Sequence, residues 1–175
     1  VDVGPKSLAA LADYALRAQI MWISTIAQDN TLGVGREQDW STHLIANELS
    51  ALYDTPHGAT LSIIMGSWMR VASEKAPFRF ARYATEVFGI RPGSMNETEL
   101  ARRGIAATES FFRSLGMPVS FKDFDLPGDG IERMLDNIDI NGPDETIGSI
   151  ARLDRDDCRR IYELAVTGPV MGKES

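Results

Sequence analysis

The sequence predicts an all-α domain of about seven helices, and three observations support this prediction. Apolar residues recur at three- and four-residue spacings along most of the 175 residues. Gly, Pro, Asn and Asp interrupt these segments at positions that are typical of helix ends. Alternation typical of β-strands is nearly absent, and the one brief case, residues 119–124, lies between Pro118 and Pro127, so we expect an extended connector there.

The first three expected helices differ in how apolar they are. The first ends at Asp29, and the second covers about residues 39–53, because a residue before a proline, here Thr55, disfavours helical geometry. The third covers about residues 58–72 and is apolar nearly all round, which is typical of a helix in the middle of a packed domain. Their apolar positions are Leu16, Ile20, Ile23 and Ala27; Ile45, Leu49 and Leu52; and Leu61, Ile64, Met65, Trp68 and Ala72.

Four further helices are expected in the second half of the chain. The fourth closes at Gly89, the fifth extends from about Asn96 to Gly116, and the sixth is short. The last begins after Asp154, where acidic residues favour the positive end of a helix. Their apolar positions are Phe80, Ala84, Val87 and Phe88; Leu100, Ala107, Phe111 and Leu115; Ile131, Leu135 and Ile138; and Cys158, Ile161, Tyr162 and Ala165. We expect one helical domain over residues 1–167 and a tail over residues 168–175.

Composition excludes several classes of protein. A net charge of −7 and a pI near 4.8 argue against nucleic acid as a partner. The longest segment without a charged residue, 55–69, is too short to span a membrane. A single cysteine, Cys158, suits a reducing, cytoplasmic compartment, and its position predicts an inert core thiol rather than a reactive one. Dinucleotide, P-loop and nucleophile-elbow motifs are missing from the sequence.

The two histidines, His43 and His57, are 14 residues apart, with a helix end between them. An antiparallel helix pair with a tight connection would bring their imidazoles together. Helical periodicity alone favours a simpler interpretation, in which His43, Asn47, Ser50 and Asp54 lie on a solvated face and both histidines are ordinary surface residues. A catalytic metal site typically needs about three protein ligands. If a metal is bound, Asp54 or protein outside this chain must therefore complete the site.

Residues 39–58, D-W-S-T-H-L-I-A-N-E-L-S-A-L-Y-D-T-P-H-G, resemble the metal-binding signature of the iron-containing (group III) alcohol dehydrogenases. The similarity is greatest to the branch of NADPH-dependent butanol dehydrogenases and aldehyde reductases. Residues 17–22, R-A-Q-I-M-W, are similar to the helix that precedes this signature in the family. Residues 111–118, F-F-R-S-L-G-M-P, and 159–163, R-R-I-Y-E, are similar to later helices. The resemblance thus covers nearly the whole chain.

The resemblance implies the helical, dehydroquinate synthase-like C-terminal domain of an enzyme whose Rossmann-like N-terminal domain is missing from this chain. The family holds one divalent ion, Fe²⁺ or Zn²⁺, through an aspartate and three histidines, of which His43 and His57 match the last two. The other two ligands would lie upstream of Val1, as expected of a fragment. The enzyme would use NADP or NAD, bound mainly by the N-terminal domain, on a small alcohol or aldehyde, and would form a homo-oligomer.

One position departs from the family pattern. Many members carry a further histidine one helical turn after the first ligand, near the nicotinamide, where this sequence has Asn47. Asn47 is therefore the expected catalytic and cofactor-facing position, although an amide cannot relay a proton at neutral pH. This departure keeps open an alternative function, a helical interaction module that has lost catalysis. A two-histidine hydrolase is disfavoured, because no nucleophile or general base accompanies the pair.

Overall fold

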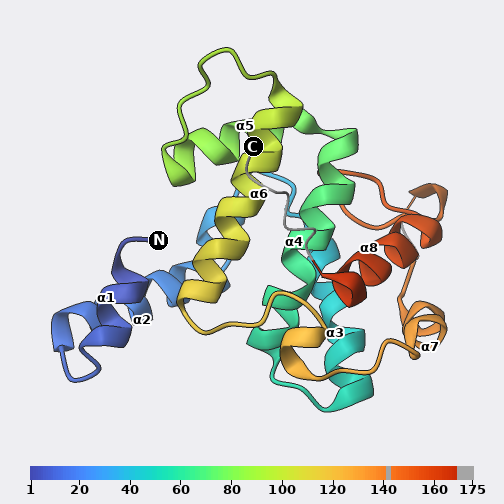
Figure 1. Ribbon diagram of the computed structural model, residues 1–175, viewed down its shortest axis with the longest axis horizontal. Helices are drawn as coiled ribbons and strands as arrows, with labels where there is room; N and C mark the ends of the chain where they lie inside the picture. Colours follow the sequence, from blue (N-terminus) through green and yellow to red (C-terminus); the bar gives the residue numbers. More distant parts are fainter. Residues whose placement is uncertain (141–142, 169–175) are drawn as a thin grey trace. The chain divides into compact units, whose positions relative to one another are not determined.

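A computed structural model describes residues 1–140 and 143–168 of the chain (Figure 1). Within these ranges the α-helices are α1 Val3–Ala9, α2 Tyr14–Gln28, α3 Ser41–Tyr53, α4 His57–Lys75, α5 Pro77–Phe88, α6 Glu97–Ser114, α7 Ile131–Asn137 and α8 Arg155–Thr167. Short 3₁₀ helices are η1 Thr31–Gly33, η2 Lys122–Phe124 and η3 Pro143–Glu145. The same ranges contain no β-strand, only an isolated antiparallel bridge between Ile147 and Leu153. The all-α prediction is confirmed.

The chain divides into two compact units, Val1–Gln38 and Asp39–Ser175. The first unit contains α1, α2 and η1, and the second contains all the other elements. The expected single domain over residues 1–167 stays a prediction, and the expected tail lies, beyond Gly168, outside the described residues. No helix in the described ranges is both long and apolar enough to cross a membrane.

The predicted helix ends agree with the structure because each has a local cause. Asp54 ends α3 in the left-handed conformation, with φ of 49°. Asn96 caps α6 by accepting a hydrogen bond from the Glu99 N–H. Asp154 and its partner Asp157 form a capping box at the start of α8.

Two expectations about local structure were wrong. The expected extended connector over residues 119–124 contains η2, a turn of 3₁₀ helix. The Val119 N–H donates a hydrogen bond of 2.9 Å to the Asp123 carboxylate and so stabilises this turn. The alternation of apolar and polar residues in the sequence gives no sign of this local contact. The other error is α1, which was not expected at all. Gly4 and Pro5 occupy its first turn, and no side chain caps it, so the usual start signal is missing.

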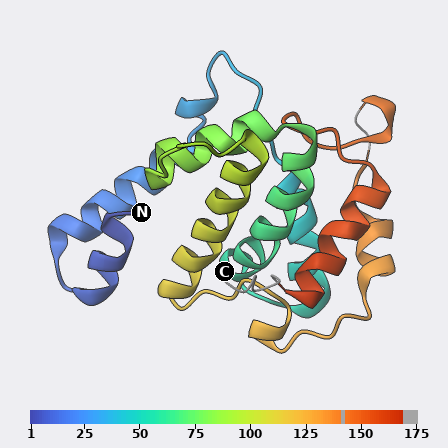
Figure 2. The same cartoon turned by 45° about the horizontal axis from the view of Figure 1, so that its top comes forward.

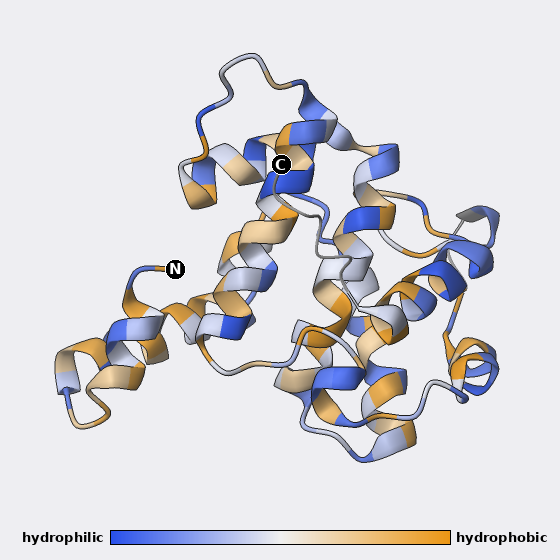
Figure 3. Ribbon diagram, viewed as in Figure 1, coloured by the Kyte–Doolittle hydropathy of each residue, from blue (hydrophilic) through white to orange (hydrophobic). Residues whose placement is uncertain are grey.

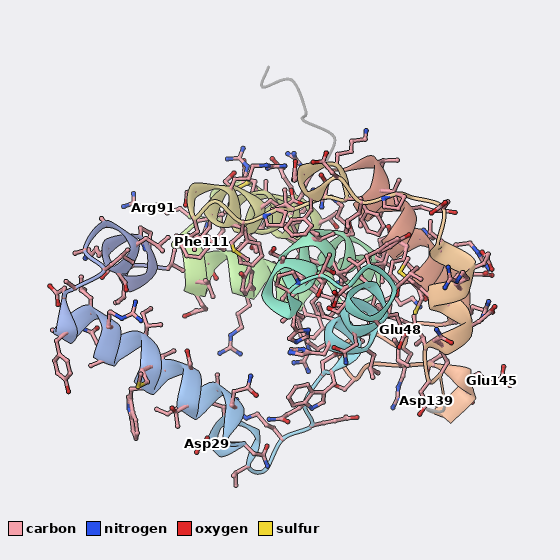
Figure 4. The ribbon with its side chains drawn as sticks, turned by 90° about the horizontal axis from the view of Figure 1, so that it is seen from below. Asp29, Glu48, Arg91, Phe111, Asp139 and Glu145 are labelled. Atoms are coloured by element: carbon pink, nitrogen blue, oxygen red, sulfur yellow. The ribbon has the colours of Figure 1, made fainter. Side chains whose placement is uncertain are left out.

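The core of the second unit is built around α4, which contacts α3, α5, α6 and α8. Figure 2 shows α6, α4 and α8 side by side, Figure 3 colours these helices by hydropathy, and Figure 4 shows side chains between the helices. The helix α4 and its neighbour α6 are joined by a two-pronged ion pair between Arg70 and Glu109, with N···O distances of 2.5 and 2.9 Å. Gly66 allows this approach, since a Cβ there would lie 2.1 Å from the Glu109 carboxylate.

The predicted apolar face of α3 faces this core. Ile45 and Leu49 are fully buried, and Leu52 is half-buried. The Tyr162 hydroxyl of α8 donates a buried hydrogen bond of 2.8 Å to the Ile45 carbonyl. Because its apolar side is fixed inside the core, α3 presents the opposite side, which carries His43, away from it.

Candidate metal centre

The two histidines meet where α3 and α4 begin. His43 is the third residue of α3, and His57 is the first residue of α4. Their ring centroids are 5.4 Å apart, with 50° between the ring planes. His43 is half-buried and His57 is exposed. The expectation that the connection between these helices brings the imidazoles together is confirmed.

The spacing of the rings suits two ligands of one metal ion. With zinc–nitrogen bonds of about 2.0–2.1 Å and tetrahedral angles, the centroids of two coordinating imidazoles lie about 5 Å apart. The observed 5.4 Å is close to this value. No group of three or more His, Cys, Asp and Glu side chains in the described ranges is placed to hold a metal. The suggestion that Asp54 adds a ligand is therefore wrong, since its left-handed backbone at the exposed end of α3 leaves it outside such a group. His43 and His57 form only part of a site.

The surroundings of His43 favour its neutral form. Partial burial lowers the pKa of His43, and the nearby His57 lowers it further. A neutral imidazole is the form that binds a metal ion, because it keeps a free nitrogen lone pair. The Trp40 ring contacts His43 edge-on, with 5.1 Å between ring centroids, and limits how far the imidazole can turn.

A carboxylate at the start of α3 fixes this end of the helix. One oxygen of Asp39 accepts hydrogen bonds from the Ser41 N–H at 2.9 Å and the Ser41 hydroxyl at 2.5 Å. The other oxygen accepts from the N–H groups of Ser149 and Ile150, both at 2.8 Å. The Trp68 indole N–H of α4 donates to the Ser41 hydroxyl oxygen at 2.8 Å. Asp39 thus ties the residues just before His43 to α4 and to the loop before α8.

The face of α3 that carries His43 is only partly solvated. Asn47, one turn after His43, is exposed. Ser50, another turn along, is half-buried, and its hydroxyl lies 2.8 Å from that of Thr60 in α4. The simpler interpretation of this face as solvent-exposed is therefore wrong at Ser50, because α4 packs against it.

Cys158 takes no part in the centre. It is fully buried on the core side of α8, as predicted. Burial, together with the neighbouring carboxylates of Asp157 and Asp154, raises the pKa of the Cys158 thiol to about 12. The alternative of a reactive, low-pKa thiol is wrong.

A cavity of about 560 Å³ that was not predicted lies in the second unit, among α4, α5 and α6. Apolar and aromatic side chains dominate its lining, and neither histidine is among them. Trp68, on the predicted apolar face of α4, is indeed nearly buried, and so is its neighbour Met69. Helical periodicity cannot distinguish a residue that fills a core from one that lines a hollow beside it.

Comparison with known proteins identifies the family to which this chain is similar. The model of the Fe-containing alcohol dehydrogenase family, C-terminal, matches residues 3–165. The chain is 33% identical over 165 residues to NADPH-dependent aldehyde reductase YqhD of Escherichia coli (strain K12), covering 94% of this chain and 42% of that protein. It is 31% identical over 166 residues to the probable NADH-dependent butanol dehydrogenase 1 of Bacillus subtilis (strain 168). This match covers 95% of this chain and 42% of that protein.

A solved structure gives the same relationship. The crystal structure of NADH-dependent butanol dehydrogenase A from Thermotoga maritima is 35% identical, with a TM-score of 0.83, covering 92% of this chain and 42% of that one. The chain thus spans about two-fifths of the length of these relatives. It belongs to the Fe-containing alcohol dehydrogenase family and corresponds to the C-terminal part of its members.

Proposed function

We propose that this chain is the metal-binding C-terminal domain of an NAD(P)-dependent alcohol dehydrogenase or aldehyde reductase. The observation that carries the proposal is the approach of the His43 and His57 rings to 5.4 Å in a member of an iron-containing dehydrogenase family. The relatives' names support a small alcohol or aldehyde as substrate and NADH or NADPH as cofactor. The activity belongs to the full-length protein, because the chain spans only two-fifths of these relatives.

In this proposal His43 and His57 each donate one imidazole nitrogen to a divalent ion, Fe²⁺ or Zn²⁺. When bound, the ion supplies Lewis-acid polarisation of the alcohol or carbonyl oxygen, and the nicotinamide carries the hydride. Asp39 holds the first turn of α3, and Trp40 restrains the His43 ring, so this ligand is oriented before the ion arrives. The remaining ligands and most cofactor contacts come from outside residues 1–175.

Asn47 faces the nicotinamide or the substrate in this proposal, because it lies one helical turn beyond His43 on the same face of α3. Its amide donates and accepts hydrogen bonds but cannot exchange a proton at neutral pH. It therefore orients a bound group, and the proton of the reaction passes through water or another residue. Asn47→His should introduce a titratable group with a pKa near 6.5, visible as a new inflection in the pH profile of turnover.

The proposal is tested on the complete gene product by substituting one ligand. His57→Ala should lose bound metal and NAD(P)H-dependent aldehyde reduction together, whereas the matched control Glu163→Ala, exposed on α8, should keep both. Metal content by elemental analysis and absorbance at 340 nm give the two readouts. Full metal occupancy in His57→Ala would overturn the assignment. The 175-residue chain alone should bind metal weakly and reduce no aldehyde.

The second candidate function is a helical interaction module without catalysis, and Asn47 is the observation that favours it. A complete gene product that binds one metal ion per polypeptide but reduces no aldehyde with either NADH or NADPH would favour this candidate. Turnover that Asn47→Ala alters would favour the enzyme.

A further inference from the structure

A chain of two hydroxyl groups joins α3 to the backbone of His57. The Thr60 hydroxyl donates a hydrogen bond of 2.9 Å to the His57 carbonyl. The Ser50 hydroxyl lies 2.8 Å from that of Thr60. A hydroxyl has a single hydrogen to donate, so Thr60, which donates to His57, accepts from Ser50. The chain therefore begins at Ser50 in α3, passes through Thr60 in α4 and ends at the carbonyl of His57.

The two hydroxyl groups lie between the helices rather than in open solvent. Thr60 is fully buried and Ser50 is half-buried. A buried hydroxyl that loses its partner is costly, because water does not replace the lost hydrogen bond. A movement of the first turn of α4 away from α3 would separate these atoms and is therefore opposed.

The two histidines differ in how their backbones are held. His43 lies in α3, which is fixed by the hydrogen bonds of Asp39 and Tyr162. His57 is the first residue of α4, its side chain is exposed, and no side chain caps this end of the helix. The position of the His57 ring relative to the His43 ring therefore depends on what ties the first turn of α4 to α3.

We propose that Ser50 and Thr60 are positioning residues for the metal centre, and that their hydroxyl chain holds His57 beside His43. This inference rests on the proposed function. The ring centroids of the histidines are 5.4 Å apart, and metal ligands must be held within about 0.5 Å of their working positions. Neither Ser50 nor Thr60 binds the ion, and each acts through the backbone of His57.

The first test removes the Thr60 hydroxyl from the complete gene product. Thr60→Val keeps the branching at Cβ and should lower the affinity for Zn²⁺ by about tenfold, measured by competition with a chromophoric chelator. Thr60→Ser restores the hydroxyl and should recover most of this affinity. Unchanged affinity in Thr60→Val would overturn the inference.

Thr108→Val is the matched control. The Thr108 hydroxyl is also nearly buried, donates to the Gly104 carbonyl at 2.9 Å and lies 3.0 Å from the Tyr83 hydroxyl. This pair joins α5 to α6, and neither helix carries a histidine. Thr108→Val should therefore lower the stability to urea about as much as Thr60→Val does, yet leave the Zn²⁺ affinity unchanged. An equal loss of affinity in both variants would attribute the effect to stability alone and refute the positioning role.

Ser50→Ala tests whether the two hydroxyl groups act as one chain. It should lower the Zn²⁺ affinity by less than Thr60→Val does, because the bond from Thr60 to the His57 carbonyl remains. The double variant should bind Zn²⁺ no more weakly than Thr60→Val, because both substitutions interrupt the same chain. Losses that multiply in the double variant would contradict a single chain.

A measurement without metal separates this inference from the proposed function. Rings this close should give a nuclear Overhauser effect between the ring protons of His43 and His57 in the metal-free complete gene product with labelled histidines. The effect should persist in Thr108→Val and weaken in Thr60→Val. Weakening in a protein that binds no Zn²⁺ would support the role of the hydroxyl chain and refute the proposed function. An effect that Thr60→Val leaves unchanged in a protein that binds Zn²⁺ would do the reverse.

Discussion

The helices α2 and α4 are both largely apolar, yet they differ completely in what surrounds them. More than half of the 19 residues of α4 are buried, and it contacts four other helices of its unit. None of the 15 residues of α2 is buried. The periodicity of a sequence indicates which side of a helix is apolar, but burial depends on what other polypeptide is present. The comparison shows that an apolar helix is not necessarily a buried one, since α4 is packed within its unit and α2 is not.

The largest effect should come from truncating α4. Ile64 is fully buried, so Ile64→Ala should lower the free energy of unfolding of the 175-residue chain by about 3 kcal/mol through lost burial and a cavity. Urea denaturation followed by circular dichroism measures this, with Ile64→Val as the milder control at about 1 kcal/mol. A loss below 1 kcal/mol for Ile64→Ala would mean that α4 is not the packed centre of the unit.

A smaller effect is expected where α4 is joined to α6 by charge. Arg70→Ala leaves the Glu109 carboxylate without its cationic partner in a site where that side chain is 4% exposed. Because Arg70 is itself about one-third exposed, the loss should be near 2 kcal/mol, below the range for fully buried pairs. Urea denaturation of the substituted and unsubstituted chains measures this loss. A loss below about 0.5 kcal/mol, as for an exposed ion pair, would contradict this explanation.

Asp39 is the first residue of the second unit. Asp39→Ala removes the acceptor of four hydrogen bonds and should destabilise the chain by about 1.5 kcal/mol. Because Trp40 and His43 follow directly, the metal affinity of the complete gene product should fall by roughly tenfold as well. Asp39→Asn, which keeps one carbonyl oxygen, should show an intermediate loss of affinity. An unchanged metal affinity in Asp39→Ala would show that the carboxylate stabilises only the fold and does not orient the histidine.

The smallest effect should be found in α2. Trp22→Ala should change the free energy of unfolding of the 175-residue chain by less than about 0.5 kcal/mol, as for an exposed side chain. Urea denaturation followed by circular dichroism measures this change. A loss above about 1 kcal/mol would remove the difference between α2 and α4 on which the comparison rests.

The sequence predicted those features that depend on neighbours along the chain. Asp54, Asn96 and Asp154 mark helix ends through their own side chains and backbone preferences, and the structure agrees at each. The meeting of His43 and His57 was one of two interpretations left open, because one short connection joins their helices although periodicity alone favoured a solvated face. In each case the cause lies within about 14 residues.

Features that depend on distant partners were not predictable. The Asp39 carboxylate bonds to Ser149 and Ile150, and no local pattern relates positions about 110 residues apart. Leu16 and Ile20 were correctly placed in a helix, but Leu16 is only half-buried and Ile20 is exposed, which periodicity does not reveal. The proposed metal site belongs to the same class, since no third His, Cys, Asp or Glu in the described ranges is placed to complete it with His43 and His57.

The separation of these contacts along the chain has a consequence for biosynthesis. His43 and His57 leave the ribosome long before Ser149, Ile150 and Tyr162, whose hydrogen bonds hold α3 in place. Until these later residues have been made, α3, which carries His43, lacks the contacts that anchor it. Under the proposed function, metal loading would therefore follow the synthesis of these later residues rather than guide the folding of α3.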